Sequence, residues 1–385
     1  MKIPILRIPY DKKDINYIQD KIKNMLNSGQ LAMGRNVEEF EKIFSNFIGV
    51  KYAVGVNSGT SALEIILRSF DIRGSSVIVP TNTFMATATS VVHAGGKIIF
   101  CDASKSDLCI DPDDISEKIQ KNTKALILVH IGGIISENFY AIREICEDNN
   151  IFLVEDAAHA HGSSLDGKMA GSLGIAGAFS FYPTKVLTCG EGGMITTDDI
   201  SIYERALVLR DHGKPDHTKN IHTEFGYNWR MSELHGILGL QQMKKAEWIL
   251  NERRRCASRY DKLLKNFTGC QTLSFSKDMQ SSYYKYIVYL SGSVKRDTIK
   301  TIMRDKYDVE LTGEVYADPC HSQPVFERYP DSLMKNKKSE GYPGADYVCE
   351  RHICLPLYPG LTDREIEYTV DSLKKAISEG YHGDS

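Results

Sequence analysis

The sequence predicts an α/β protein with a mostly parallel, doubly wound sheet in a large domain and a smaller C-terminal α+β domain. Between residues 50 and 200, short apolar runs alternate with amphipathic ones, which is typical of a layer of strands and helices. Several apolar runs are continuous in Val, Ile and Leu, as expected for strands that are covered on both faces. The length of 385 residues favours more than one domain.

The main sheet is predicted from a series of short apolar runs. These runs are Ala53–Val56, Ser76–Val79, Lys97–Phe100, Ala125–Val129, Ile151–Glu155, Ala178–Phe181 and Gly193–Thr196. Helical patterns lie between them, at Ser61–Ser69, Thr83–His93 and Asn138–Asn149. In such sheets ligands bind beyond the carboxyl ends of the strands. We therefore expect the residues at those ends to converge on one site, namely Asn57, Pro80, Asp156 and Phe181.

The C-terminal part has the pattern of a second domain. A long helical run from Ser232 to Phe267 is predicted to link the two domains. A strand is expected within residues 283–290, and a helix over Lys295–Lys306. Another helix is expected to begin at Thr362, because Thr362 and Glu365 have the spacing of a capping box. We place the large domain, with the N-terminal segment and linking helix, at residues 1–250 and the small one at 251–385.

Composition and charge exclude several classes of function. The chain is 42% hydrophobic and 25% charged with a net charge of −3, and it has no long run of one sign. It therefore lacks the electrostatic pattern expected of a nucleic-acid or membrane partner. The longest apolar runs are too short to span a membrane, and the N-terminus has no secretory pattern. Nine scattered cysteines without a C-x-x-C pair indicate reduced thiols. We expect a cytoplasmic protein.

The two strongest candidate catalytic residues are Asp156 and Lys185. Asp156 ends the strand-like run IFLVED, where a buried carboxylate requires a cationic partner. Lys185 follows an apolar strand in a loop, where burial can make an amine reactive toward an aldehyde. A carboxylate for a protonated ring nitrogen and a lysine for a covalent tether are what pyridoxal phosphate requires. The alternatives are a helix cap for Asp156 and a solvated surface lysine for Lys185.

Three further motifs could complete such a site. In NSGTSALEIIL, Gly59 permits close backbone approach, and the amides of a helix N-terminus could bind phosphate; the alternative is a plain helix cap. Phe84 lies at the next strand-to-helix junction, where its ring could stack on a cofactor or simply pack in the core. His159 and His161 form an H-x-H pair, but no third ligand stands at a suitable spacing, so we predict no metal site.

Five segments in this order resemble the DegT/DnrJ/EryC1/StrS family of sugar aminotransferases, which have fold type I of the pyridoxal-phosphate enzymes. The likeness covers nearly the whole chain. The segments are GRNVEEFEKIFSNFIGVKYAVGVNSGTSAL, VPTNTFMATATSVVHAGGKIIFCD, LVEDAAHAHGS, FSFYPTKVLTCGEGGMITTDD and GYNWRMSELHGILGLQQ. Two segments depart from the family pattern: HIGGIIS lacks the usual proline, and CGEGG replaces a sequence that more often ends in GDGG. Both weaken any transfer of substrate identity.

The resemblance implies a role for each candidate cofactor residue. Lys185 would form the Schiff base with the cofactor aldehyde, and Asp156 would pair with the pyridine nitrogen. His159 would lie near the ring hydroxyl, and Phe84 would stack on the ring. The phosphate would be held by Gly59, Thr60 and Ser180.

The resemblance also implies a homodimer with shared active sites. Asn228, in the segment GYNWR, would reach the phosphate of the cofactor in the neighbouring subunit. Arg230 and His321 are candidates for substrate contacts.

The implied activity is the transfer of an amino group from glutamate or glutamine to a keto-sugar in amino-sugar biosynthesis. The substrate implied is nucleotide-linked, a 3-keto or 4-keto deoxysugar. Four alternatives stay open: an aminocyclitol (keto-inositol) aminotransferase, a sugar dehydratase, a non-catalytic regulator and a binding module. The dehydratase branch of the family has histidine in place of the lysine, so Lys185 counts against it. A non-catalytic regulator would be expected to have lost Lys185 or Asp156, and both are present. No feature of the sequence distinguishes a sugar substrate from a cyclitol substrate.

Overall fold

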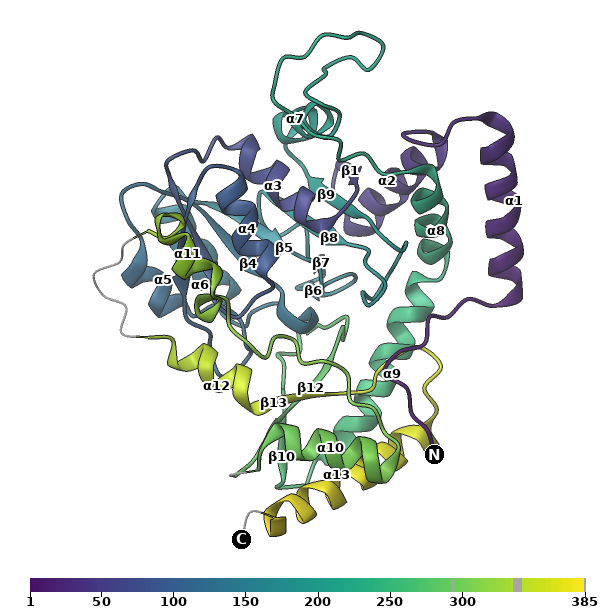
Figure 1. Ribbon diagram of the computed structural model, residues 1–385, viewed down its shortest axis with the longest axis vertical. Coiled ribbons are helices and arrows are strands. Elements are labelled where there is room, and N and C mark those ends of the chain that lie inside the picture. The colour runs from purple at the N-terminus through teal and green to yellow at the C-terminus, as the bar shows by residue number, and fades with distance from the viewer. Residues whose placement is uncertain (293, 335–340, 384–385) are drawn as a thin grey trace.

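The fold is built around a seven-stranded mixed sheet, seen in the upper part of the computed structural model in Figure 1. The structure describes residues 1–292, 294–334 and 341–383. The strand order is β1-β9-β8-β5-β4-β2-β3, with β9 antiparallel to both neighbours and the other pairs parallel. The strands are β1 (Tyr52–Val56), β2 (Ser76–Pro80), β3 (Lys97–Cys101), β4 (Thr123–Val129), β5 (Phe152–Asp156), β8 (Ala176–Ser180) and β9 (Gly193–Thr197). The predicted mostly parallel sheet is confirmed.

Helices cover both faces of this sheet. The chain runs in one direction along the sheet from β1 through β2 to β3, then reverses through β4 to β5. Because crossovers between parallel strands are right-handed, the helices before and after the reversal lie on opposite faces. One group is α3 (Gly59–Ser69) and α4 (Met85–His93), which pack together; the other is α5 (Pro112–Lys118) and α6 (Phe139–Asp148), which also pack together.

The burial of β2 shows why its sequence is continuously apolar. Val77, Ile78 and Val79 are all completely buried, although successive side chains point to opposite faces of the sheet. Both faces are therefore shielded from water, as expected for a parallel sheet between two helical layers. The carboxyl ends of such strands, where the side chains leave the packed layers, are the positions open to a ligand.

The smaller C-terminal part contains an antiparallel sheet of order β10-β12-β13, seen in the lower part of Figure 1. Three helices pack around it, and α13 contacts both α9 and α10. The elements are β10 (Cys270–Thr272), β12 (Tyr286–Leu290), β13 (His352–Leu355), α9 (Ala246–Leu264), α10 (Arg296–Tyr307) and α13 (Asp363–Gly383). The expected strand and helices of this part are thus present, in a smaller α+β arrangement.

Strand β12 has two buried faces. Ile287 and Tyr289 belong to the hydrophobic core of the main sheet, whereas Tyr286, Val288 and Leu290 belong to a second core beneath α9, α10 and α13. Successive side chains of this strand therefore lie alternately in two different cores, rather than alternately in one core and in solvent. Ile3, near the N-terminus, also packs in the second core.

The long helical run after Ser232 is two helices, α8 (Glu233–Lys244) and α9, and not one continuous helix as expected. Lys245 joins them with φ −107° and ψ 1°, outside the α-helical region. Its ammonium group binds the Asp14 carboxylate at 2.6 Å and the Pro9 carbonyl at 2.9 Å. The break therefore coincides with the point where the N-terminal segment is attached. The division into domains at residue 250 stays a prediction.

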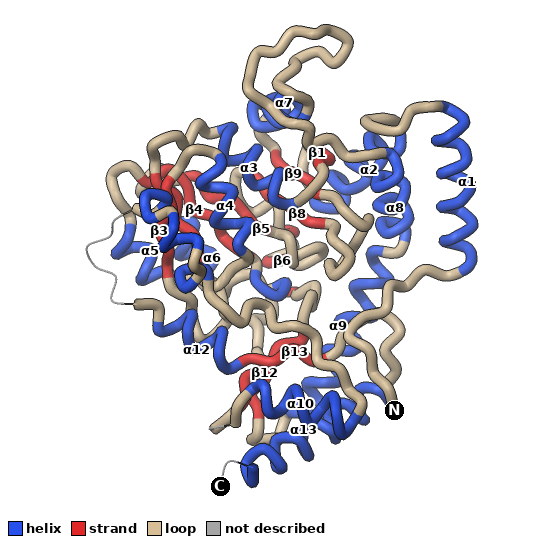
Figure 2. Tube along the Cα trace, in the orientation of Figure 1, coloured by secondary structure: helices blue, strands red, loops and turns tan. Residues whose placement is uncertain are grey.

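The remaining elements flank these two sheets, and Figure 2 shows a long loop that extends from the body between α7 and α8. They are α1 (Lys12–Ser28), α2 (Arg35–Ile48), α7 (Ile200–Arg210), α11 (Val325–Arg328), α12 (Pro343–Arg351), β6 (Ser164–Leu165), β7 (Lys168–Met169) and β11 (Met279–Gln280), with short 3₁₀ turns at Ile131–Gly133, Cys320–Ser322 and Pro330–Ser332. The predicted capping box is confirmed: the Thr362 amide donates to the Glu365 carboxylate at 2.8 Å, and the Glu365 amide donates to the Thr362 hydroxyl at 3.3 Å. All nine cysteines are buried and free. Within the described part of the chain, no helix is long and apolar enough to cross a membrane.

Candidate active site

A cavity of about 570 Å³ lies at the carboxyl edge of the main sheet. The last residues of three neighbouring strands line it: Val129 of β4, Asp156 of β5 and Ser180 of β8. Tyr284, just before β12, and Tyr316, after α10, complete the wall from the C-terminal part. The cavity also brings together most of the predicted cofactor residues, namely Gly59, Thr60, Phe84, Asp156, His159, Ser180 and Lys185.

The Asp156 carboxylate is buried at the end of β5 and held by two hydrogen bonds. The Thr87 hydroxyl donates to Oδ2 at 2.8 Å, and the Ala158 amide donates to Oδ1 at 3.2 Å. Burial raises the pKa of this carboxyl above its ordinary value, and the two hydrogen bonds and the charge of Lys185 only partly offset that effect. A cationic ligand group beside the carboxylate would stabilise its charged form.

Lys185 lies half-buried in the loop after β8, with its amine facing the cavity wall. The Lys185 Nζ atom is 4.9 Å from the centre of the Tyr284 ring. Burial lowers the pKa of this amine to about 8, with the Asp156 charge acting in the opposite direction. At neutral pH the Lys185 amine is therefore uncharged more often than an ordinary lysine, which favours nucleophilic attack.

The N-terminus of α3 forms one end of the cavity. The Ser58 hydroxyl caps the helix by accepting the Ser61 amide at 3.1 Å, so the amides of Gly59 and Thr60 are the first-turn donors beside the cavity. A Cβ atom at Gly59 would lie 2.9 Å from Cβ of Ser180, which is too close. Only glycine therefore lets the helix begin against the end of β8. The result is a cradle of backbone amides suited to a phosphate group.

His159 is a neutral hydrogen-bond donor in this cavity. Its Nδ1 atom accepts the Gly132 amide at 3.3 Å, so the proton is on Nε2, which faces the Tyr316 hydroxyl at 3.3 Å. Burial lowers the pKa of His159 well below its ordinary value. The His159 ring stacks on Tyr284 at a centroid distance of 4.1 Å.

Phe84 is 60% exposed, so the alternative that it is a core residue is wrong.

These side chains match the groups of pyridoxal phosphate that need protein partners. The α3 amides and the Ser180 hydroxyl suit its phosphate, and the buried Asp156 carboxylate suits a protonated pyridine nitrogen. The Lys185 amine suits its aldehyde, and the exposed ring of Phe84 can lie against a flat heterocycle. The residues of the cavity therefore fit this cofactor.

Comparison with known proteins identifies the chain's relatives. Residues 12–374 match the model of the DegT/DnrJ/EryC1/StrS aminotransferase family. The chain belongs to this family. It is an aminotransferase of a pyridoxal-phosphate-dependent family, and the predicted family and enzyme class are confirmed.

Named relatives align over almost their whole length with this aminotransferase. The spore coat polysaccharide biosynthesis protein SpsC of Bacillus subtilis is 32% identical over 93% of each chain. GDP-perosamine synthase of Escherichia coli O157:H7 is 29% identical over 98% of this chain and 99% of its own. The solved structure of Helicobacter pylori PseC, an aminotransferase involved in the biosynthesis of pseudoaminic acid, has a TM-score of 0.88 at 25% identity. It covers 98% of this chain and 100% of its own.

Three predicted site residues of this aminotransferase do not line the cavity of their own chain. Asn228 is exposed, and its carbonyl accepts the Asn57 side-chain amide at 3.4 Å. Arg230 forms an ion pair with Asp211. The Nδ1 atom of His321 is hydrogen-bonded to the Thr81 hydroxyl at 2.8 Å. Their roles toward a neighbouring subunit or a substrate stay predictions.

The expected convergence of four strand-end residues is wrong for three of them. Only Asp156 lines the cavity. Phe181 turns into the core, with its ring centre 5.0 Å from that of Phe40 and 5.4 Å from that of Phe44. Pro80 is buried as the last residue of β2, and the Asn57 side chain accepts the Ser61 hydroxyl. Side chains at a strand end alternate in direction, so position along the chain did not fix which of them face the cavity.

Several cavity residues were not predicted from the sequence. Thr87 lies three residues after Phe84, a spacing that places two residues on the same face of a helix. This spacing could have predicted that Thr87 faces the same cavity as Phe84. Tyr284 and Tyr316 come from the distant C-terminal part, and no local pattern marks them as wall residues. Glu191, in the segment CGEGG, is an exposed carboxylate at the cavity wall.

The two histidines of the H-x-H pair have different surroundings. His161 is completely buried in an aromatic cluster, with its ring centre 5.2 Å from that of Phe179 and 5.1 Å from that of Phe181. His159 instead faces the cavity. The described residues contain no group of three or more His, Cys, Asp or Glu side chains that could hold a metal ion.

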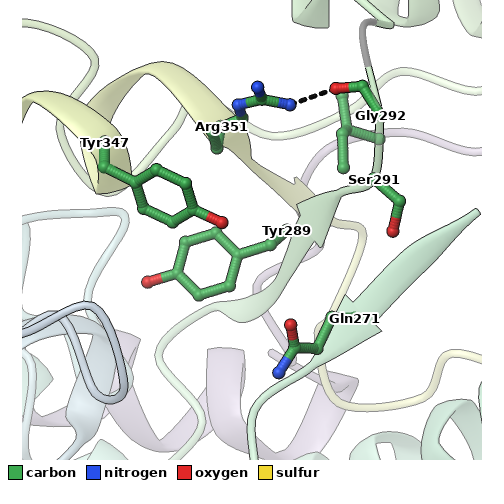
Figure 3. A pocket seen from close by; sticks show the side chains of 7 residues that line it. Gln271, Tyr289, Ser291, Gly292, Tyr347 and Arg351 are labelled. Carbon is green, nitrogen blue, oxygen red and sulfur yellow. Dashed lines mark hydrogen bonds between the residues drawn. The ribbon is translucent and has the colours of Figure 1, made fainter.

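A second, shallower cleft of about 590 Å³ lies on the C-terminal part, between the ends of β10 and β12 and helix α12 (Figure 3). Tyr289 and Tyr347 lie at one side, and the Arg351 guanidinium donates to the Gly292 carbonyl. Its lining includes no predicted site residue, and its arginine already has a partner. The cavity at the main sheet is therefore the candidate active site.

Proposed function

We propose that this aminotransferase moves an amino group from glutamate or glutamine to a nucleotide-linked keto-sugar, a 3-keto or 4-keto deoxysugar, in amino-sugar biosynthesis. The observation that carries the proposal is the Lys185 amine and the buried Asp156 carboxylate on one cavity, beside the α3 amides. The names of relatives support the substrate class, since one of them is a GDP-perosamine synthase. A cytoplasmic location is part of the proposal and agrees with nine free thiols.

Each residue would have a distinct part in the reaction. Bound pyridoxal phosphate supplies an electron sink for the carbanion formed at the donor's α-carbon. The Lys185 amine would hold the cofactor covalently, then take the proton from the α-carbon and return it to the cofactor carbon, as base and then acid. The Asp156 carboxylate would keep the ring nitrogen protonated, which favours that electron flow.

Other side chains would position the cofactor. The amides of Gly59 and Thr60 with the Ser180 hydroxyl would bind the phosphate, and Phe84 would cover one face of the ring. The proton on Nε2 of His159 is available to the ring hydroxyl once the contact with Tyr316 is exchanged. None of these groups needs to change its charge during turnover.

We also propose that the active enzyme is a homodimer in which each subunit completes the site of the other. Figure 2 shows the long loop after α7 extending away from the body, and Phe225 within it is 95% exposed. A second copy of the chain would cover this apolar surface. Asn228, which is exposed in its own chain, would then reach the neighbour's phosphate cradle.

A substrate panel tests the proposal. The pyridoxamine form of the enzyme is mixed with nucleotide-linked 3-keto and 4-keto sugars and with keto-inositol, and amines are detected by mass spectrometry. Turnover of a nucleotide-linked sugar is expected, together with return of the pyridoxal absorbance. Turnover of keto-inositol alone would identify an aminocyclitol enzyme instead, and no amine from any substrate would contradict the proposed function.

A further inference from the structure

Two lysine side chains lie beside the same aromatic ring at the cavity wall. The Lys185 Nζ atom is 4.9 Å from the centre of the Tyr284 ring, and the Lys285 Nζ atom is 5.3 Å from it. The Tyr284 hydroxyl is 3.2 Å from that of Thr184, which ties the ring to the loop that carries Lys185. The two Nζ atoms therefore lie within about 10 Å of each other and share one neighbouring ring.

Lys285 has no carboxylate of its own within ion-pair distance in the described part of the chain. The nearby carboxylate, Glu314, binds Lys300 at 2.7 Å and lies 3.9 Å from Arg296. The charge of the buried Arg253 also acts on Lys285, and its guanidinium donates to the carbonyls of Tyr283 at 2.9 Å and Leu357 at 3.3 Å. Positive charge therefore exceeds negative charge around Lys285.

The other titratable groups near the two amines are uncharged at neutral pH. Burial lowers the pKa of His159 well below its ordinary value and raises the pKa of Tyr316 well above its own. The Cys354 thiol beside Lys285 has its pKa raised to about 12 by burial. Beyond burial, the charges that act on the Lys185 amine are then the Asp156 carboxylate, which favours protonation, and the Lys285 ammonium, which opposes it.

We propose that Lys285 is a positioning residue whose charge increases the fraction of the Lys185 amine that is in its reactive, neutral form. This inference rests on the proposed function, in which the Lys185 amine attacks an aldehyde and later accepts a proton. A like charge nearby disfavours a second charge in a partly buried site. Lys285 thus partly offsets the opposite effect of Asp156, a carboxylate that the cofactor ring would require.

The charge state of Lys185 can be measured directly. Full-length protein freed of cofactor with hydroxylamine is labelled with trace acetic anhydride at a series of pH values, and acetylation of Lys185 is quantified by mass spectrometry. The labelling midpoint of the natural protein is expected near pH 8. In Lys285→Met the midpoint should move up by about one pH unit. In Lys285→Arg, which keeps the charge, it should stay near 8.

Matched controls separate this effect from a general disturbance. Lys168→Met removes an exposed lysine on β7, away from the cavity, and should leave the midpoint unchanged. An unchanged midpoint in folded Lys285→Met would overturn the proposal. If that variant fails to fold, a midpoint near 10.5 in the natural protein would overturn it equally. Borohydride fixation in the cofactor-loaded enzyme tests Lys185 as the attachment site separately, so failure of the proposed function can be told apart from failure of this inference.

Discussion

The Thr87 hydroxyl in α4 donates a 2.8 Å hydrogen bond to Oδ2 of Asp156 at the end of β5. Because Thr87 donates here, its oxygen accepts from the Thr83 hydroxyl, also at 2.8 Å, and the three groups form a short buried chain. Hydrogen bonds in such a chain strengthen one another where water is excluded. The orientation of the Asp156 carboxylate is therefore set by α4, the helix that begins directly after Phe84.

Thr87→Val should reduce activity while preserving the fold, because it removes a hydrogen bond and keeps the side-chain shape. Loss of a bond to a charged group corresponds to about 1.5–3 kcal/mol, or roughly tenfold or more in kcat/KM. Steady-state kinetics and cofactor affinity provide the measurements. Thr87→Ser, which retains the hydroxyl, should stay within a few-fold of the natural enzyme. Equal losses in both variants would show that packing, rather than the hydroxyl, matters.

Asp156→Asn should lower transamination by about 10²-fold or more, since it removes the charge that would hold the ring nitrogen protonated. The half-reaction with glutamate, followed by the change in cofactor absorbance, measures this step. His159→Gln should have a milder effect, because a contact to the ring hydroxyl tunes the cofactor without accepting electrons. Nearly unchanged turnover in Asp156→Asn would leave that residue with a purely structural role.

Covalent attachment of the cofactor to Lys185 should become faster as pH rises toward 8 and level off above it. The pKa of this amine is lowered to about 8, so its neutral fraction increases through that pH and saturates beyond it. Stopped-flow absorbance of cofactor-free protein mixed with pyridoxal phosphate gives the rate.

Borohydride reduction and peptide mapping should place the label on Lys185, and label on Lys285 would contradict the assignment. Lys185→Ala should bind the cofactor non-covalently and show no turnover.

A mixture of two inactive variants tests the shared site. Lys185→Ala and Asn228→Asp each damage one half of the proposed composite site, the second by placing a negative charge against the phosphate. After subunit exchange a mixed dimer would have one doubly damaged and one intact site, so about a quarter of the natural activity should return in an equal mixture.

Verified exchange without recovery of activity would place Asn228 in its own subunit's site or away from any site. Size-exclusion chromatography with light scattering supplies the control for this experiment. A monomer in solution would contradict the shared site regardless of the activity measured.

Most of the main sheet was predictable because its signals are local. Both ends of each predicted apolar run lie within two residues of the ends of an observed strand. The runs were recognisable because a strand covered on both faces must be apolar throughout. The break at Lys245 was not predictable, because it coincides with contacts to Asp14, which is remote in sequence. The direction of Phe181 was missed for a related reason: packing against Phe40 and Phe44 sets it.

The candidate site was predictable only in part. Asp156, Lys185 and Gly59 lie at strand or helix ends within about 130 residues, and their surroundings in the sequence marked them. Tyr284 and Tyr316 reach the cavity, and Lys285 reaches the Tyr284 ring, through the packing of the C-terminal part, which no local pattern describes. The cofactor roles given to His159, Ser180 and Asn228 came from resemblance to a family rather than from the pattern of residues.

The two buried faces of β12 limit how the cavity can open. A hinge that separated the C-terminal part from the main sheet would draw Ile287 and Tyr289 out of the main core. Exposing one such side chain costs about 1.5–3 kcal/mol, so wide rigid-body opening is unfavourable. Entry and exit of a large substrate should instead depend on movement of the loops that carry Tyr182 and Glu191, both exposed at the cavity wall. The rate of product release would then follow loop mobility, and the wall formed by Tyr284 would stay in place throughout the catalytic cycle.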